Sequence, residues 1–137
     1  YEASQAGVEI DLIVRGICCL IPGQTYSRNI RVTRIVDTFL EHARIWYFGN
    51  GGNPKLFLGS PDWMRRNLYR RIEAVTPILD PDAKQELIDM LSIQLSDKRK
   101  ACFVDENLRN CWKSAHPQKE KVRSQYTFYE YLKEKTE

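Results

Sequence analysis

Two residues of this 137-residue chain have types and positions suited to phosphate chemistry. Arg15 follows a run of β-branched residues, and ligands of open α/β sheets gather outside the carboxyl ends of strands. His42 precedes another predicted strand, and if that strand reaches back to His42, the two-residue period places His42 and Arg44 on one face. An imidazole that exchanges protons near neutral pH, beside a planar guanidinium, is suited to holding phosphate. From the residues alone, a solvated charge at Arg15 and a structural role for His42 remain alternatives.

The chain's other reactive residue types form no recognised site. The four cysteines lack Cys-x-x-Cys spacing, so we expect reduced, mostly buried thiols and no zinc site. The second histidine, His116, is interpreted as a surface residue in a loop. No Gly-x-x-x-x-Gly-Lys-Ser/Thr sequence occurs, which excludes a P-loop kinase. We predict no metal ligand, because the carboxylates show no magnesium spacing.

Strand and helix patterns are interspersed along the sequence. Alternating or continuous apolar runs predict strands at 8–14, 30–36, 45–48, 56–58, 71–76 and 99–104. The Gly- and Asn-rich residues 49–54 predict a hairpin loop. Asp80 is predicted to cap a helix that begins at Pro81, and a second amphipathic helix is predicted around 122–132. We therefore expect an α/β fold with a mixed β-sheet flanked by helices.

Composition favours one soluble domain over residues 1–137. The chain is 42% hydrophobic and 28% charged, with no apolar run long enough for a transmembrane segment. Because the sequence opens inside a helix-like segment, we interpret it as part of a larger protein. The net charge of +3 is too small to identify a partner. We expect a cytoplasmic location, with peripheral attachment to the inner membrane as a further option.

Clusters of basic residues and the tryptophans have ordinary structural explanations. Arg65, Arg66, Arg70 and Arg71 could guide a polyanion, but such runs are more often solvated, and the same holds for residues 98–100. Trp46, Trp63 and Trp112 are interpreted as core residues rather than stacking platforms.

Several short segments resemble a half-site of the phospholipase D superfamily, which has His-x-Lys, an Asp five residues after the Lys, Gly-Ser and a later Glu. The matching residues are His42-Ala43-Arg44, Asn50, Gly59-Ser60 and Glu73. Arg44 replaces the Lys and Gly49 occupies the Asp position, which argues against a phosphodiesterase of that superfamily.

The sequence more closely resembles the polyphosphate kinase branch of the same phospholipase D-like fold, specifically its C-terminal catalytic domain. The matching segments, in order, are EASQAGV (2–8), LIVRGIC (12–18), IVDTFLEH (35–42), YFGNG (47–51) and DWMRRNL (62–68). The resemblance implies a phosphotransferase that moves the terminal phosphate of ATP reversibly onto polyphosphate through a phosphohistidine. The phosphorylated histidine of the family lies in the preceding domain.

By the same resemblance, Arg15 matches the arginine that contacts the nucleotide phosphates, and His42 matches the second active-site histidine. His42 is thus expected to be catalytic, and Arg15 and His42 to bind ATP and phosphate. Arg44, Asn50 and Ser60 are lower-ranked residues of the same pocket.

The implied partners are ATP or ADP, polyphosphate, the upstream domains of the same enzyme and further copies of it in a homo-oligomer. Magnesium is expected to have its ligands outside this chain, and no nucleic acid is expected to bind. We expect the isolated 137 residues not to turn over ATP. A phospholipase D-like phosphodiesterase and a non-catalytic polyanion-binding module are the alternative functions.

Overall fold

The computed structural model describes residues 1–136, which form two compact units. Unit 1 comprises residues 1–41 together with the chain from Ser92 onward, and unit 2 comprises His42–Leu91. The chain passes between the units at the Glu41–His42 peptide and again within helix α3 (Pro81–Ser96). That residues 1–137 act as a single domain stays a prediction.

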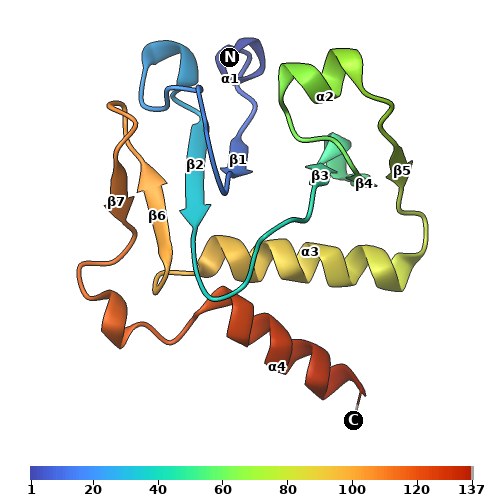
Figure 1. The fold of residues 1–137 in the computed structure, drawn as a ribbon, viewed down its shortest axis with the longest axis vertical. Coiled ribbons are helices and arrows are strands. Elements are labelled where there is room, and N and C mark those ends of the chain that lie inside the picture. The colour runs from blue at the N-terminus through green and yellow to red at the C-terminus, as the bar shows by residue number, and fades with distance from the viewer. Residues whose placement is uncertain (137) are drawn as a thin grey trace. The chain divides into compact units, whose positions relative to one another are not determined.

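A four-stranded mixed sheet forms the centre of unit 1 (Figure 1). Its strand order is β1 (Ile10–Ile13), β2 (Ile30–Ile35), β6 (Ala101–Val104) and β7 (Asn110–Trp112). Strands β1 and β2 are parallel, whereas β2–β6 and β6–β7 are antiparallel. The expected mixed sheet is therefore confirmed, although β7 was not predicted because its three residues show no apolar alternation.

The core of unit 1 follows from the register of β1 with β2. Ile10 pairs with Ile30 and Leu12 with Val32, so these four side chains share one face of the sheet. Ile30, Val32 and Val104 are at most 5% exposed. Each such buried aliphatic side chain contributes roughly 1.5–3 kcal/mol by leaving water.

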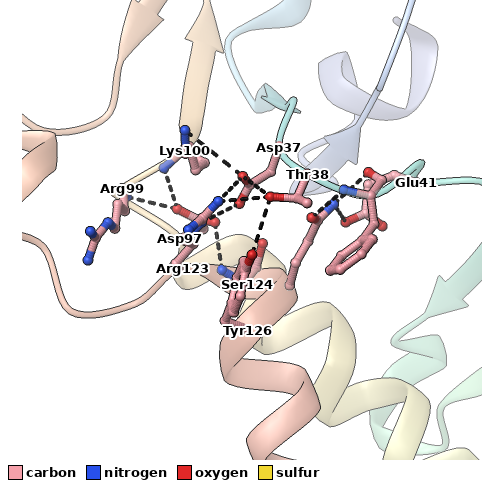
Figure 2. A network of polar contacts seen from close by, with 11 residues as sticks. Asp37, Thr38, Glu41, Asp97, Arg99, Lys100, Arg123, Ser124 and Tyr126 are labelled. Atoms are coloured by element: carbon pink, nitrogen blue, oxygen red, sulfur yellow. Dashed lines mark hydrogen bonds and ion pairs between the residues drawn. The ribbon is translucent and has the colours of Figure 1, made fainter.

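Asp97 fixes the start of helix α4 (Ser124–Thr136) in unit 1. Its side chain is fully buried, and its Oδ2 accepts the backbone N–H of Ser124 at 2.8 Å. Its Oδ1 accepts the N–H groups of Arg99 and Lys100, both at 2.8 Å (Figure 2). Because the first N–H groups of a helix lack helical partners, a carboxylate there satisfies a donor and complements the helix dipole.

An ion pair joins the chain beyond β2 to the residue before α4. Arg123 donates from Nε to Asp37 Oδ2 at 2.7 Å and from Nη2 to Oδ1 at 2.6 Å (Figure 2). The Asp37 side chain is 2% exposed, and Lys100 Nζ lies 3.9 Å from Oδ1. These cations and hydrogen bonds, led by those from Arg123, hold the pKa of Asp37 below its usual value.

The residues after Asp37 are also tied to α4. Gln125 accepts the N–H of Phe39 at 2.8 Å and donates to its carbonyl at 2.7 Å. Gln125 also donates to Glu41 Oε1 at 2.9 Å, and Gln94 donates to Glu41 Oε2 at 3.1 Å. The segment 37–41 is thus anchored along its length by side chains of unit 1.

Unit 2 contains an antiparallel sheet of β3 (Ile45–Phe48), β4 (Lys55–Gly59) and β5 (Val75–Pro77). The predicted hairpin loop joins β3 to β4 through a short 3-10 turn, Asn50–Gly52. Helix α2 (Arg65–Arg70) was not predicted, and the strand expected at 71–76 begins only at Val75. The Glu73 side chain, ahead of that strand, accepts hydrogen bonds from Ser60 and Asn67.

Helix α3 is confirmed at its predicted start, where Asp80 Oδ1 accepts the N–H of Ala83 at 2.8 Å. Helix α4 and strands β1, β2, β3, β4 and β6 also occupy their predicted places, with bounds that shift by up to a few residues. No helix within residues 1–136 has the length and apolar character to span a membrane.

Gly59 should not tolerate a methyl group. A Cβ there would lie 2.6 Å from Trp46 Cζ3 and 2.9 Å from Val75 Cγ2. We expect Gly59→Ala to lower the free energy of unfolding by about 1–3 kcal/mol, the cost of overpacking. Gly49→Ala is the matched control, because nothing lies within 4 Å of its added Cβ and its φ is −62°. Equal urea midpoints for both variants would contradict this packing argument.

The Asp37–Arg123 pair should make stability depend on pH. Because the pKa of Asp37 is lowered on folding, its contribution is present above about pH 4 and is lost as the pH falls through the lowered pKa. We expect Arg123→Gln to lower the urea midpoint at pH 7 and to flatten the loss of stability below pH 4. Arg109→Gln, which removes the exposed partner of Asp105, should have a smaller effect at pH 7. A larger effect from Arg109→Gln would refute the importance of the Asp37 pair.

Candidate functional site

Arg15 contacts the peptide that leads into His42. Strand β1 ends at Ile13, so Arg15 lies just beyond its carboxyl end, as predicted. Its Nη1 donates to the carbonyl oxygen of Glu41 at 2.7 Å. Among residues 1–136 its other N–H groups have no hydrogen-bond partner, so most of this exposed guanidinium is free to hold an anion.

His42 and Arg44 are hydrogen-bonded to each other. The distance from His42 Nε2 to Arg44 Nη2 is 2.9 Å. Arginine can only donate, so Nε2 accepts and the ring proton of neutral His42 is on Nδ1. Strand β3 begins at Ile45 and does not reach back to His42, so strand alternation is not what brings the two side chains together. The two side chains meet in the segment before the strand.

A carboxylate holds Arg44 in place. Its Nε and Nη2 both lie 3.0 Å from Asp62 Oδ1, and the Arg44 side chain is 22% exposed. Arg44 thus donates from Nε to Asp62 and from Nη2 to the His42 ring. The guanidinium therefore orients the imidazole.

The Ser60 and Glu73 positions of the half-site motif also meet. The Ser60 hydroxyl donates to Glu73 Oε2 and accepts the N–H of Ala74 at 3.1 Å. Asn67 donates to Glu73 Oε1 at 2.7 Å. Hydrogen bonds from Ser60 and Asn67, with Arg71 and Arg44 nearby, hold the pKa of Glu73 below its usual value. Glu73 is thus an ionised acceptor rather than a proton donor at neutral pH.

These carboxylates do not fit a magnesium site. Within the described residues, no three or more His, Cys, Asp or Glu side chains gather in a way that could hold a metal ion. Asp62 is paired with Arg44, and both oxygens of Glu73 accept hydrogen bonds from Ser60 and Asn67.

The structure agrees with some of the remaining sequence predictions and contradicts others. Asn50 donates to the carbonyl of Asn53 at 2.9 Å within its own loop, which is a structural role. His116 is exposed, as expected, and all four cysteines are free thiols. The expectation that the thiols are mostly buried was wrong, because Cys19 and Cys111 are exposed and Cys18 and Cys102 are only partly buried. The assignment of the tryptophans to the core was wrong for Trp63 and Trp112, which are 72% and 59% exposed.

Sequence reasoning missed the residues that support the segment before His42. Asp37 and Arg123 are 86 positions apart, and neither belongs to a motif that predicts the other. Gln94 and Gln125 likewise carry no signal in the sequence. Only the apolar pattern of β2 indicated that a loop must follow near Asp37.

Comparison with known proteins identifies relatives over nearly the whole chain. Residues 1–125 match the family described as polyphosphate kinase C-terminal domain 2. A polyphosphate kinase of Synechocystis is 60% identical over 102 residues, covering 74% of this chain and 14% of that protein. A polyphosphate kinase of Escherichia coli is 46% identical over 134 residues, covering 97% of this chain and 19% of that protein.

A solved structure shares the fold. The crystal structure of polyphosphate kinase from Porphyromonas gingivalis superimposes with a TM-score of 0.93 at 57% identity, over 98% of this chain and 20% of that one. The expected phospholipase D-like α/β fold is thereby confirmed. The chain spans about a fifth or less of the relatives it matches. By sequence over most of its length and by structure, it belongs to the polyphosphate kinase C-terminal domain family.

Proposed function

We propose that this chain supplies part of the active site of an enzyme that transfers the terminal phosphate of ATP reversibly to polyphosphate. In this proposal Arg15 binds phosphate and His42 assists the transfer. The phosphorylated histidine belongs to an upstream domain, so the isolated 137 residues do not turn over ATP. The observation that carries the proposal is the 2.7 Å hydrogen bond from Arg15 to the carbonyl of Glu41, the residue before His42.

Arg15 would neutralise charge during the transfer. Phosphoryl transfer spreads negative charge over the phosphate oxygens, and catalysis depends mainly on positioning and on stabilising that charge. The bond to the Glu41 carbonyl restrains the guanidinium and leaves its remaining N–H groups for phosphate oxygens. Because Glu41 is itself held by Gln94 and Gln125, this restraint is part of unit 1.

His42 would act through the ring nitrogen that does not face Arg44. With Nε2 accepting from Arg44, the Nδ1–H is available to donate. It can donate a hydrogen bond to the departing ADP oxygen when ATP phosphorylates the upstream histidine. To transfer a proton to that oxygen, His42 must first become imidazolium, with Nε2 exchanging the Arg44 hydrogen bond for a proton, and in the reverse direction the neutral ring takes the proton back. A weaker form of the proposal gives His42 only a hydrogen bond to phosphate.

The proposed enzyme also has ligands, a metal ion and further subunits beyond the residues discussed above. ATP or ADP, polyphosphate and magnesium are its expected ligands, with the metal held outside this chain. Further copies in a homo-oligomer and a cytoplasmic location, at or near the inner membrane, complete the proposal. A non-catalytic polyanion-binding module is the outcome if the complete enzyme binds polyphosphate but transfers no phosphate.

Substitution of His42 tests its role. In the complete enzyme, His42→Ala should lower the rate of ATP-dependent polyphosphate synthesis by roughly two to four orders of magnitude, the range for a general acid or base. His116→Ala is the matched control, because that histidine is exposed in a loop. His42→Gln keeps a hydrogen-bond donor without proton transfer, so near-complete recovery would indicate the weaker role. Near-normal turnover of His42→Ala would exclude both the proton-transfer role and the hydrogen-bonding role of His42.

Substitution of Arg15 tests phosphate binding. Arg15→Gln in the complete enzyme should lower kcat/KM for ATP by roughly tenfold to a hundredfold, because a charge-assisted donor is lost. Arg15→Lys should recover part of that loss, since it keeps the charge without the planar fork. Arg28→Gln, an exposed arginine of the same unit, is the control. An unchanged kcat/KM in Arg15→Gln would remove this residue from the site.

A further inference from the structure

A second cationic surface lies in unit 1, on residues to which the proposed reaction gives no role. It is a groove with a volume of about 700 Å³, within the ~300–1,000 Å³ common for small-ligand sites. Its cationic lining consists of Arg99, Lys100 and Arg123, and its uncharged lining includes Trp112 and Gln118. None of the lining residues is acidic. We call this surface the β6–α4 groove.

The two carboxylates nearest the groove are buried and bonded internally. Asp37 is 2% exposed and paired with Arg123, and Asp97 is fully buried with its oxygens accepting backbone N–H groups. Glu120 accepts from the hydroxyl of Ser114, a lining residue, so one further negative charge lies beside the groove. The groove therefore presents cations to solvent while most opposing charge is buried behind it.

The Arg99 side chain lines the groove with donors that have no partner among residues 1–136. Its backbone N–H is fixed by Asp97, which sets where the side chain leaves the chain. Its guanidinium makes no hydrogen bond or ion pair with any residue in the described part of the chain, although it is only partly exposed. Figure 2 shows this side chain pointing away from the Asp37–Arg123 network. A half-buried guanidinium with free donors is suited to an oxyanion ligand.

Trp112 adds the N–H of an exposed indole to the groove lining. It is 59% exposed at the end of the short strand β7, where a large aromatic side chain gains little from burial. Its indole N–H can donate to an anionic oxygen. Lys100, whose Nζ is 3.9 Å from Asp37, keeps donors free on the same wall of the groove.

We infer that the β6–α4 groove binds a linear chain of inorganic phosphate groups, as a polyphosphate-holding subsite apart from Arg15 and His42. The inference rests on the proposed function, because polyphosphate is the substrate it assigns. Several cations along one groove match a ligand that carries negative charge on every phosphate, and such binding depends on cation contacts rather than on shape. A polyphosphate molecule held in the groove would be elongated further before release, so the enzyme would make longer polyphosphate.

A matched pair of neighbouring substitutions tests the inference in the complete enzyme. Arg99→Gln removes a cation of the groove, and Lys98→Gln removes an exposed cation one position away that does not line it. Binding of end-labelled inorganic polyphosphate is measured without nucleotide, by fluorescence anisotropy over a range of salt concentrations. We expect Arg99→Gln to weaken binding about threefold to tenfold and to reduce the slope of log affinity against log salt by about one. Lys98→Gln should stay within about twofold of the unmodified enzyme.

The same variants are compared in synthesis and in ATP binding. Arg99→Gln should make shorter polyphosphate while the initial rate of ATP consumption stays near normal. Equal polyphosphate affinities for Arg99→Gln and Lys98→Gln would overturn the inference. A loss of ATP affinity as large as the loss of polyphosphate affinity would also overturn it, because the groove would then hold a nucleotide. If the unmodified enzyme made no polyphosphate, the proposed function would be refuted. The binding comparison would still test the groove, because it needs no turnover.

Discussion

The ion pair between Asp37 and Arg123 is the constraint on which the functional surfaces of unit 1 depend. A carboxylate that is 2% exposed must be paired, because an isolated buried charge costs several kcal/mol. Arg123 satisfies it from the residue before α4, so the end of β2 and the start of α4 are held at a fixed separation. Gln125, two residues beyond Arg123, bonds to Phe39 and Glu41 on the same two segments. The carbonyl that receives Arg15 is therefore positioned by a pair of residues remote from it in sequence.

The same network also builds the β6–α4 groove. Arg123 lines it while its guanidinium bonds to Asp37, and Asp97 fixes the backbone N–H groups of Arg99 and Lys100. Two buried acids thus hold three basic residues at the groove. Because both carboxylates are buried, they organise the cations without themselves meeting a ligand in the groove. An anion-binding surface can in this way be stable before any anion arrives.

The sequence predicted the local elements better than their partners. Apolar periodicity located β2, α3 and the β3–β4 hairpin, because those signals depend on neighbouring residues. It could not predict that the strands divide into two sheets, nor find β7 and α2, whose short segments are defined by tertiary contacts. Arg15 and His42 were identified from residue type, position and family resemblance. The contacts that orient them, from Glu41 and Arg44, required the structure, since His42 lies outside the strand expected to align it.

The hydrogen bond between His42 and Arg44 bears on which group carries the phosphate. A phosphohistidine forms when a ring nitrogen attacks phosphorus through a free lone pair. In the tautomer that this contact implies, the Nε2 lone pair of His42 is occupied by the Arg44 donor, and Nδ1 carries a proton. Attack through Nε2 would require His42 to lose the bond from Arg44, and attack through Nδ1 would require it to lose that proton first, whereas a hydrogen bond donated from Nδ1 requires neither. The contact therefore favours His42 as a hydrogen-bond donor to a phosphate oxygen, in agreement with the proposal that the phosphorylated histidine belongs to an upstream domain.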